Sequence, residues 1–162
     1  MNLTKLFQMQ RDLDRYIEKQ RDIQNDVFER KVVALYVELG ELANETRCFK
    51  FWSSKGPSAK EVILEEYVDS IHFLLSLGLE KEWHEKVEVW PPGRHVQDLT
   101  EGFLITYEAI AKLRIEPTLD RYQSVWEGYA EIARQLGFTT DEVTEAYYQK
   151  NEINYARQQS GY

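Results

Sequence analysis

The sequence predicts an all-α protein, a bundle of about five to six helices. Apolar residues recur at the three- and four-residue spacings of helix faces. No strand-like alternation of any length occurs, and Gly-Pro and Pro-Pro-Gly breaks separate the helical segments. The chain has 162 residues, of which 43% are hydrophobic and 30% charged. This is enough to bury one core, so we expect a single domain over residues 1–162.

Charge and cysteine content limit the function classes. The net charge of −8 argues against binding of duplex nucleic acid, because phosphate contacts need a basic surface. Cys48 is the only cysteine, which rules out an internal disulfide and suits a reducing compartment. The sequence shows no signal peptide and no apolar run of membrane-spanning length. We therefore expect a cytoplasmic protein that binds neither nucleic acid nor membranes.

The first helix is expected to begin near residue 3 and to end within the charged run 21–31. Its apolar face carries four residues: Leu3, Leu6, Leu13 and Ile17. Gln10 falls on this face where Leu or Ile would be expected, and Asp14 borders it. A buried Gln needs partners for its amide. Gln10 either caps a neighbouring helix or offers a donor and an acceptor that match the edge of a pyrimidine base.

A second helix is expected over about 27–49, with Glu38 and Glu41 beside its apolar stripe rather than opposite it. Residues 49–57 then form a loop that is rich in aromatic and basic residues: Phe49, Lys50, Phe51, Trp52 and Lys55. The aromatic side chains either plug the end of the bundle or form a wall on which a base stacks. In the second case Lys50 or Lys55 would lie near phosphate.

The third helix is expected over 62–79, with Ser58 as its N-cap and Glu61 completing a capping box. It is apolar almost all round, which is typical of a central helix. Glu66, Asp69 and His72 nevertheless lie on one stripe at three-residue intervals. Charged groups in a central helix are costly unless they are paired or bind metal. This helix therefore carries the strongest functional signal in the sequence.

Three more helices are expected over 96–114, 119–136 and 140–158, with Gly137 closing the second and Thr140 capping the third. An aromatic face around Trp126 suits packing or a subunit interface. The last helix carries a polar stripe: Lys150, Asn154 and Arg157, flanked by Asn151. This stripe is either solvated or a clamp for an anion.

The two acid pairs Glu38-x-x-Glu41 and Glu66-x-x-Asp69 each place two carboxylates on one side of a helix. On two antiparallel core helices the four groups would converge and repel each other without cations. All-oxygen ligands favour two or more Mg²⁺ ions, with Mn²⁺ as a substitute, over zinc. The alternatives are surface acids without a ligand and a di-iron site. A di-iron site needs Glu-x-x-His on two helices, a pattern that the sequence lacks.

The spacing of these pairs resembles the signature of the all-α nucleoside triphosphate pyrophosphohydrolases, which include the MazG-type enzymes and the dimeric dUTPases. Three further segments look like those of the dimeric dUTPases: residues 6–14, 49–53 and 150–162. The first departs from the family pattern, because Asp14 stands where that family often has Asn. The resemblance spans nearly the whole chain.

The resemblance implies a homodimeric enzyme that hydrolyses dUTP, and dUDP, to dUMP with Mg²⁺-activated water. The four paired carboxylates would hold the metal, with Glu38 and Glu41 catalytic and Glu38 as general base. Phosphate would be bound by five residues: Lys55, Lys150, Asn151, Asn154 and Arg157. Base and sugar would be bound by four: Gln10, Asp14, Trp52 and His72. A MazG-like enzyme of different or broader specificity and a non-catalytic nucleotide sensor remain alternatives.

Overall fold

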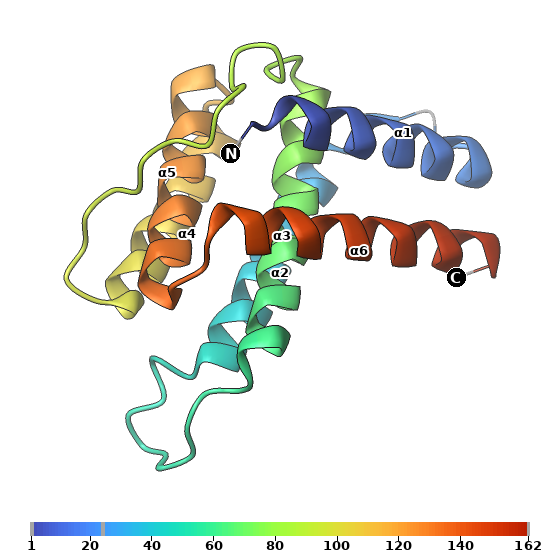
Figure 1. The fold of residues 1–162 in the computed structure, drawn as a ribbon. Helices are drawn as coiled ribbons and strands as arrows, with labels where there is room; N and C mark the ends of the chain where they lie inside the picture. Colours follow the sequence, from blue (N-terminus) through green and yellow to red (C-terminus); the bar gives the residue numbers. More distant parts are fainter. Residues whose placement is uncertain (1, 24, 162) are drawn as a thin grey trace.

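The computed structural model describes residues 2–23 and 25–161, and this part of the chain forms six α-helices (Figure 1). They are α1 (Thr4–Arg21), α2 (Phe28–Thr46), α3 (Lys60–Glu80), α4 (Leu99–Ile115), α5 (Leu119–Leu136) and α6 (Thr140–Gln159). The all-α prediction is confirmed. Tyr162, the last residue of the C-terminal motif, lies outside the described residues.

Helices α2 and α3 form an antiparallel pair in the middle of the molecule (Figure 1). Lys31 of α2 contacts Glu80 of α3 at one end, and Ser58 bonds to Glu45 at the other. Helix α3 is buried on almost every side, as predicted, and six of its hydrophobic side chains are fully inaccessible: Tyr67, Val68, Ile71, Leu74, Leu75 and Leu77. The central helix of the sequence is therefore central in the structure.

The other four helices flank this pair on two sides. Helices α4 and α5 pack together on one side, and α4 also lies against α2, where Arg114 meets Glu29 at 3.1 Å. Helices α1 and α6 run side by side across α3 (Figure 1). They are parallel, since Tyr147 bonds to Gln10 near their starts and Arg21 bonds to Gln158 near their ends. No described helix is long and apolar enough to cross a membrane.

Helix boundaries differ from the sequence predictions where side chains find other partners. Ser58 does not cap α3, because its hydroxyl donates to Glu45 of α2 instead; the expected capping box is therefore wrong. Helix α2 ends at Thr46, before the predicted residue 49, and α4 begins only after Asp98, whose carboxylate caps it. The cap of α6 is Thr139, one residue before the predicted Thr140.

The aromatic face of α5 packs inside the chain. Tyr122, Trp126 and Tyr129 are all inaccessible to solvent, and Trp126 contacts Trp90 edge-on at 5.3 Å between ring centroids. The packing prediction for this face is confirmed. The alternative that Trp126 contributes to a subunit interface is wrong, because a second chain could not reach it.

Candidate active site

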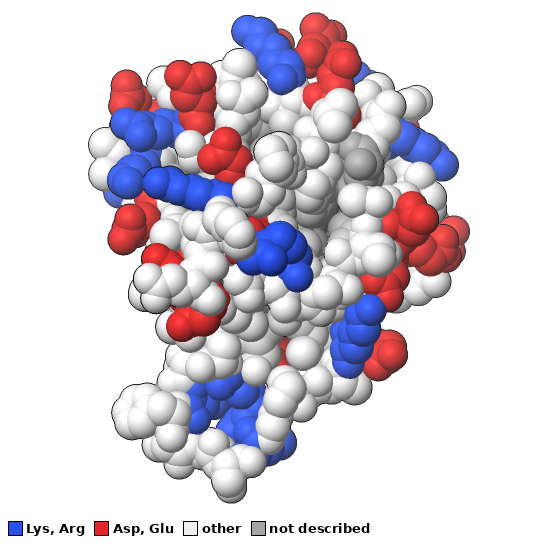
Figure 2. All heavy atoms as spheres, turned by 60° about the vertical axis from the view of Figure 1, so that its left-hand side comes forward, with Lys and Arg blue, Asp and Glu red and all other residues white. Residues whose placement is uncertain are grey.

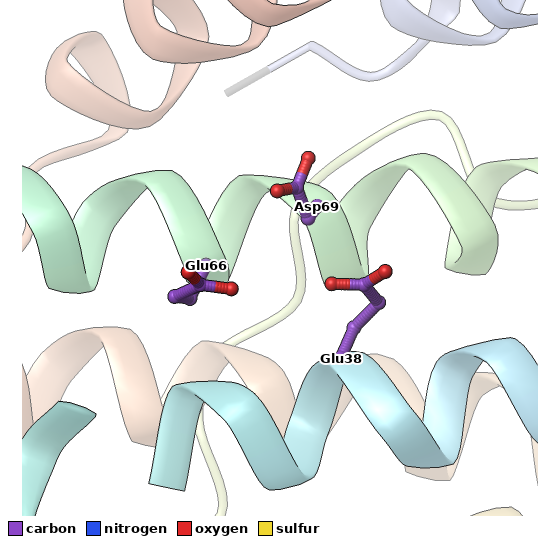
Figure 3. Close-up of side chains that lie close together, drawn as sticks. All are labelled: Glu38, Glu66 and Asp69. Carbon is purple, nitrogen blue, oxygen red and sulfur yellow. The ribbon is translucent and has the colours of Figure 1, made fainter. Parts of the chain in front are cut away.

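Three carboxylates meet between α2 and α3. One oxygen each from Glu38, Glu66 and Asp69 lies within 4.8 Å of the others. Figure 3 shows Glu38 rising from α2 toward α3, which carries Glu66 and Asp69 one turn apart. All three side chains are half-buried. We call these three residues the acidic cluster.

Burial and mutual repulsion make the acidic cluster hard to ionise. Burial first, and then the charges of Asp69, Glu41 and Glu66, raise the pKa of Glu38 to about 7. Burial and the charges of Asp69 and Glu41 likewise raise the pKa of Glu66, and burial raises that of Asp69. A cation between the helices would remove this penalty.

Glu41 occupies the rim of the acidic cluster. Its side chain is exposed, and it is not among the three converging carboxylates. Its charge still reaches the cluster, because it contributes to the raised pKa values of Glu38 and Glu66. The structure thus brings together three of the four predicted ligands and leaves the fourth within electrostatic range.

Lys150 supplies positive charge to the acidic cluster from α6. Its Nζ lies 2.6 Å from Asp69 Oδ2 and 2.8 Å from Glu65 Oε1, and only 7% of its side chain is exposed. Glu65 was not predicted as a site residue. The signal was available, because Glu65 and Asp69 are four residues apart and share one face of α3. Asn151, beside Lys150, is also buried.

A cavity of about 270 Å³ adjoins the acidic cluster between α1, α3 and α6. Seven of the predicted site residues line it: Gln10, Asp14, Glu38, Asp69, His72, Asn154 and Arg157. Apolar side chains, including Leu13, Ile17 and Phe73, complete its wall. The cavity therefore combines carboxylates, an apolar surface, and amide and guanidinium groups from the last helix.

Gln10 lies at the centre of a polar network on one wall of this cavity. Its Oε1 accepts from Tyr147 OH at 2.9 Å and lies 2.7 Å from His72 Nδ1. Its Nε2 donates to Asp14 Oδ1 at 2.7 Å, and Asp14 Oδ2 accepts from Ser76 Oγ at 2.5 Å. The alternative that Gln10 caps a helix is wrong, since these partners are side chains.

Tyr147 and Ser76 were not predicted as site residues. Both lie on stripes that helical spacing identifies, because Tyr147 precedes Lys150 by three residues and Ser76 follows His72 by four. Tyr147 also stacks on His72, with ring centroids 4.2 Å apart. Burial lowers the pKa of His72 to about 3, so its ring is neutral. We call Gln10, Asp14, His72, Ser76 and Tyr147 the Gln10 network.

Trp52 and Lys55 lie outside the cavity. Their loop projects from the ends of α2 and α3 that lie away from α1 (Figure 1). Trp52 is 65% exposed and Phe51 is 93% exposed, so the alternative that the aromatics plug the bundle is wrong. The loop also carries Arg47 and Lys50 but no acidic residue, and Figure 2 shows blue and white atoms without red at this lower end.

The donor set of the acidic cluster suits a hard cation. Carboxylate oxygens are the ligands that Mg²⁺ and Mn²⁺ prefer. His72 does not join the cluster, because its Nδ1 faces Gln10 and its Nε2 is buried without a partner. The geometry of the described residues therefore offers no His ligand of the kind that a di-iron site needs.

Comparison with known proteins gives a match that covers nearly the whole chain. A family model described as dUTPase matches residues 2–162. No curated protein matches the chain.

Proposed function

The chain belongs to the dUTPase family and is a dUTP diphosphatase, and from this premise we propose how it acts. It would work in the cytoplasm as a Mg²⁺-dependent enzyme that converts dUTP, and dUDP, to dUMP, releasing pyrophosphate from dUTP. The observation that carries the proposal is the acidic cluster of Glu38, Glu66 and Asp69 at the edge of a nucleotide-sized cavity. These residues would hold two or more metal ions, with Glu41 completing the set from the rim.

Bound Mg²⁺, or Mn²⁺ in its place, would neutralise phosphate charge and lower the pKa of a water molecule. Glu38 is the best placed general base, because it belongs to the acidic cluster and also lines the cavity. Asp69 shares both properties but is ion-paired with Lys150. Glu38 has no ion pair among the described residues, so its carboxylate is the one available to take a proton from water.

The last helix would bind the phosphates. Asn154 and Arg157 line the cavity, and the planar fork of Arg157 suits two oxygens of one phosphate group. Lys150 lies beside the acidic cluster, where the phosphate chain and the metal would meet. Asn151, next to Lys150 in the chain, is buried, and its Nδ2 has no hydrogen-bond partner in the described structure.

The direct test is pyrophosphate release from dUTP with and without Mg²⁺, with dUDP, dCTP, dTTP and UTP as comparison substrates. Glu41→Gln removes one charge from the rim without changing its shape. We expect it to lower activity by more than about tenfold, since even groups outside the metal's direct ligands often contribute this much. Glu61→Gln, an exposed change on α3, should leave activity intact. Full activity in Glu41→Gln would exclude Glu41 from the metal site.

The same assay separates the alternatives. Equal rates with several triphosphates would favour a MazG-like enzyme of broad specificity. Tight dUTP binding without release of pyrophosphate would favour a nucleotide-sensing module.

We also propose a homodimer formed through α2 and α4. Four apolar side chains on these helices are more than half exposed: Val33 (60%), Val37 (51%), Leu104 (58%) and Ile115 (78%). Tyr36 and Tyr107 stack between the two helices at this surface. Val33, Val37 and Glu41 follow one another at four-residue intervals, so they share one face of α2. Because Glu41 lies at the rim of the acidic cluster, a second chain on this face would lie beside that cluster. Its basic, aromatic loop could then provide Trp52 and Lys55 to that site.

Two experiments test this dimer. Val37→Glu should yield a monomer by light scattering with an unchanged helical spectrum, whereas Val89→Glu, an exposed change in the α3–α4 connection, should not. Mixing inactive Trp52→Ala and Glu66→Gln proteins should restore activity if Trp52 acts across the dimer, because one site in each mixed dimer is intact. No recovery from mixed dimers would assign Trp52 to its own chain.

A further inference from the structure

A second groove lies along the seam between α4 and α5, and it shares no described lining residue with the cavity beside the acidic cluster. Its volume is about 320 Å³. One wall is the α3–α4 connection, which runs past α4 and α5 on the side away from α3 (Figure 1). The N–H of Arg94 donates to the carbonyl of Glu127 at 3.4 Å, which fastens this connection to α5. We call the space between residues 94–96, 101–112 and 121–124 the α4–α5 groove.

Positive charge reaches the α4–α5 groove from three segments of the chain. Arg94 comes from the connection, Lys112 from the last turn of α4 and Arg121 from the first turn of α5. Residues 116–118 join the two helices, so the end of α4 lies beside the start of α5. The whole chain has a net charge of −8, so its composition does not account for three cations at one groove.

Two acidic side chains also line the groove, but neither neutralises its basic end. Glu101 lies at the start of α4, about 16 Å along the helix from Lys112, and its Oε2 accepts from the N–H of Gln97 at 2.6 Å. Glu108 lies 3.9 Å from Lys112, and both side chains are more than half exposed. An ion pair of this length and exposure contributes little to stability. Glu108 can therefore turn into solvent when an anion binds Lys112.

The cationic groups retain most of their capacity to donate hydrogen bonds. The guanidinium group of Arg94 has neither an ion pair nor a hydrogen bond among the described residues, and the same is true of the neighbouring His95 ring. Arg121 makes one exposed ion pair, at 3.7 Å from Glu116. A guanidinium group carries five N–H donors in a planar fork that matches two oxygens of a phosphate group. The groove is therefore equipped for an anion with several oxygens.

We propose that the α4–α5 groove is a second, non-catalytic site that binds a diphosphate group, either as free pyrophosphate or as part of a nucleotide. Arg94, Lys112 and Arg121 bind its oxygens. Beside these cations the lining is apolar and suits the nucleoside part of a nucleotide: Val96, Ile105 and Ala109. The proposal is independent of the action on dUTP, because it involves no residue of the acidic cluster or of its cavity.

Titration of the protein with pyrophosphate in a calorimeter, with a chelator present, tests this site. Lys112→Gln and Arg121→Gln should each weaken binding by at least about tenfold, because each removes hydrogen bonds to a charged group. Glu108→Gln should tighten binding, since it removes the carboxylate that competes for Lys112. Arg114→Gln removes a charge from the same turn of α4 outside the groove and should keep the wild-type affinity.

Arg157→Gln separates this groove from the cavity beside the acidic cluster. Pyrophosphate binding that persists in Arg157→Gln and weakens in Lys112→Gln belongs to the groove. The opposite pattern, or no binding by wild type at millimolar pyrophosphate, would overturn the proposal. Lys112→Gln should also hydrolyse dUTP at the wild-type rate. A loss of hydrolysis in folded Lys112→Gln protein would show that the groove is not separate from the active site, which would overturn the proposal as well.

ADP in place of pyrophosphate distinguishes the two sources of the diphosphate group. If a nucleotide is the ligand, ADP should bind more tightly than pyrophosphate, and Ile105→Ala should remove part of that advantage. If free pyrophosphate is the ligand, ADP should bind no more tightly, and Ile105→Ala should change neither affinity. Both results support a diphosphate site, provided that Lys112→Gln weakens the binding. ADP binding that is indifferent to Lys112→Gln would contradict it.

Discussion

The acidic cluster and the Gln10 network lie next to each other along α3, yet they differ in how far the protein satisfies them. In the Gln10 network, donors and acceptors pair with one another, and Lys31 lies near the one carboxylate, Asp14. In the acidic cluster, Lys150 pairs with Asp69 alone of the three carboxylates, and it is also bound to Glu65. In the Gln10 network only the buried Nε2 of His72 lacks a partner among the described residues, whereas the acidic cluster lacks positive charge. This difference separates a surface whose polar groups mostly hold one another in place from a cluster of carboxylates that a cation would stabilise.

The largest effect should come from removing one charge of the acidic cluster. Glu66→Gln should lower dUTP hydrolysis by more than about 100-fold, because loss of a metal ligand costs at least as much as loss of its supporting partner. In metal-free protein the same change should raise the melting temperature, since it relieves repulsion with Glu38 and Asp69.

Melting curves with Mg²⁺ and with a chelator would measure both sides of this prediction. Mg²⁺ should stabilise wild-type protein more than Glu66→Gln. Glu61→Gln serves as the control, because it removes a charge from α3 at an exposed position. A metal-free Glu66→Gln protein that melts below wild type would show that the three carboxylates do not repel as their positions indicate.

A smaller effect should appear in the pH dependence of stability. Burial, with the charges of Asp69, Glu41 and Glu66, raises the pKa of Glu38 from 4.5 to about 7. The folded protein therefore binds this proton more tightly than the unfolded chain does. Its contribution to stability is complete below pH 4.5 and is lost as the pH rises to about 7.

Thermal unfolding of metal-free protein across this pH range would test the assignment. Wild type should lose melting temperature toward neutral pH, and Glu38→Gln should lose less, because it has no proton to release. Added Mg²⁺ should reverse the trend, since metal binding needs the ionised form. If the melting temperatures of the two metal-free proteins depend on pH in the same way, Glu38 is not the group whose pKa is raised.

Much of the recognition side was predictable from helical spacing. Gln10 and Asp14 on α1, His72 on α3 and Asn154 on α6 all line one cavity, because each lies on a face that points toward the other helices. The same reasoning was less accurate for the acidic pairs. Glu66 and Asp69 are three residues apart and both join the acidic cluster, whereas Glu41, three residues after Glu38, remains on the exposed rim. The spacing within one helix therefore does not decide which carboxylates converge, because that depends on which face of α2 meets α3.

The errors came from contacts between segments distant in the sequence. Ser58 has the local pattern of a cap, but Glu45 of α2 captures its hydroxyl. The spacing of the aromatic residues around Trp126 is the same for a face that packs within the chain and for one that forms a subunit interface. The contact between Trp90 and Trp126 shows that this face packs within the chain. The direction of the Trp52 loop depends on where α2 and α3 end, which periodicity does not specify.

The smallest effect should come from Glu65, which holds Lys150 at the boundary between the two regions. The Glu65 side chain is 56% exposed, and an ion pair of this exposure contributes little to stability. Its role would appear in metal affinity. When Mg²⁺ binds Asp69, Glu65 can keep Lys150 paired. Among the described residues, Glu65→Gln leaves Asp69 as the only charged partner of Lys150, so Mg²⁺ must compete with that lysine directly.

We therefore expect Glu65→Gln to raise the Mg²⁺ concentration for half-maximal dUTP hydrolysis a few-fold, with little change in kcat at saturating Mg²⁺. Titration of activity against Mg²⁺, with Glu61→Gln as the control, would measure this shift. An unchanged Mg²⁺ requirement would mean that Lys150 does not compete with metal for Asp69. In that case the lysine would supply charge to the acidic cluster both with and without its cations.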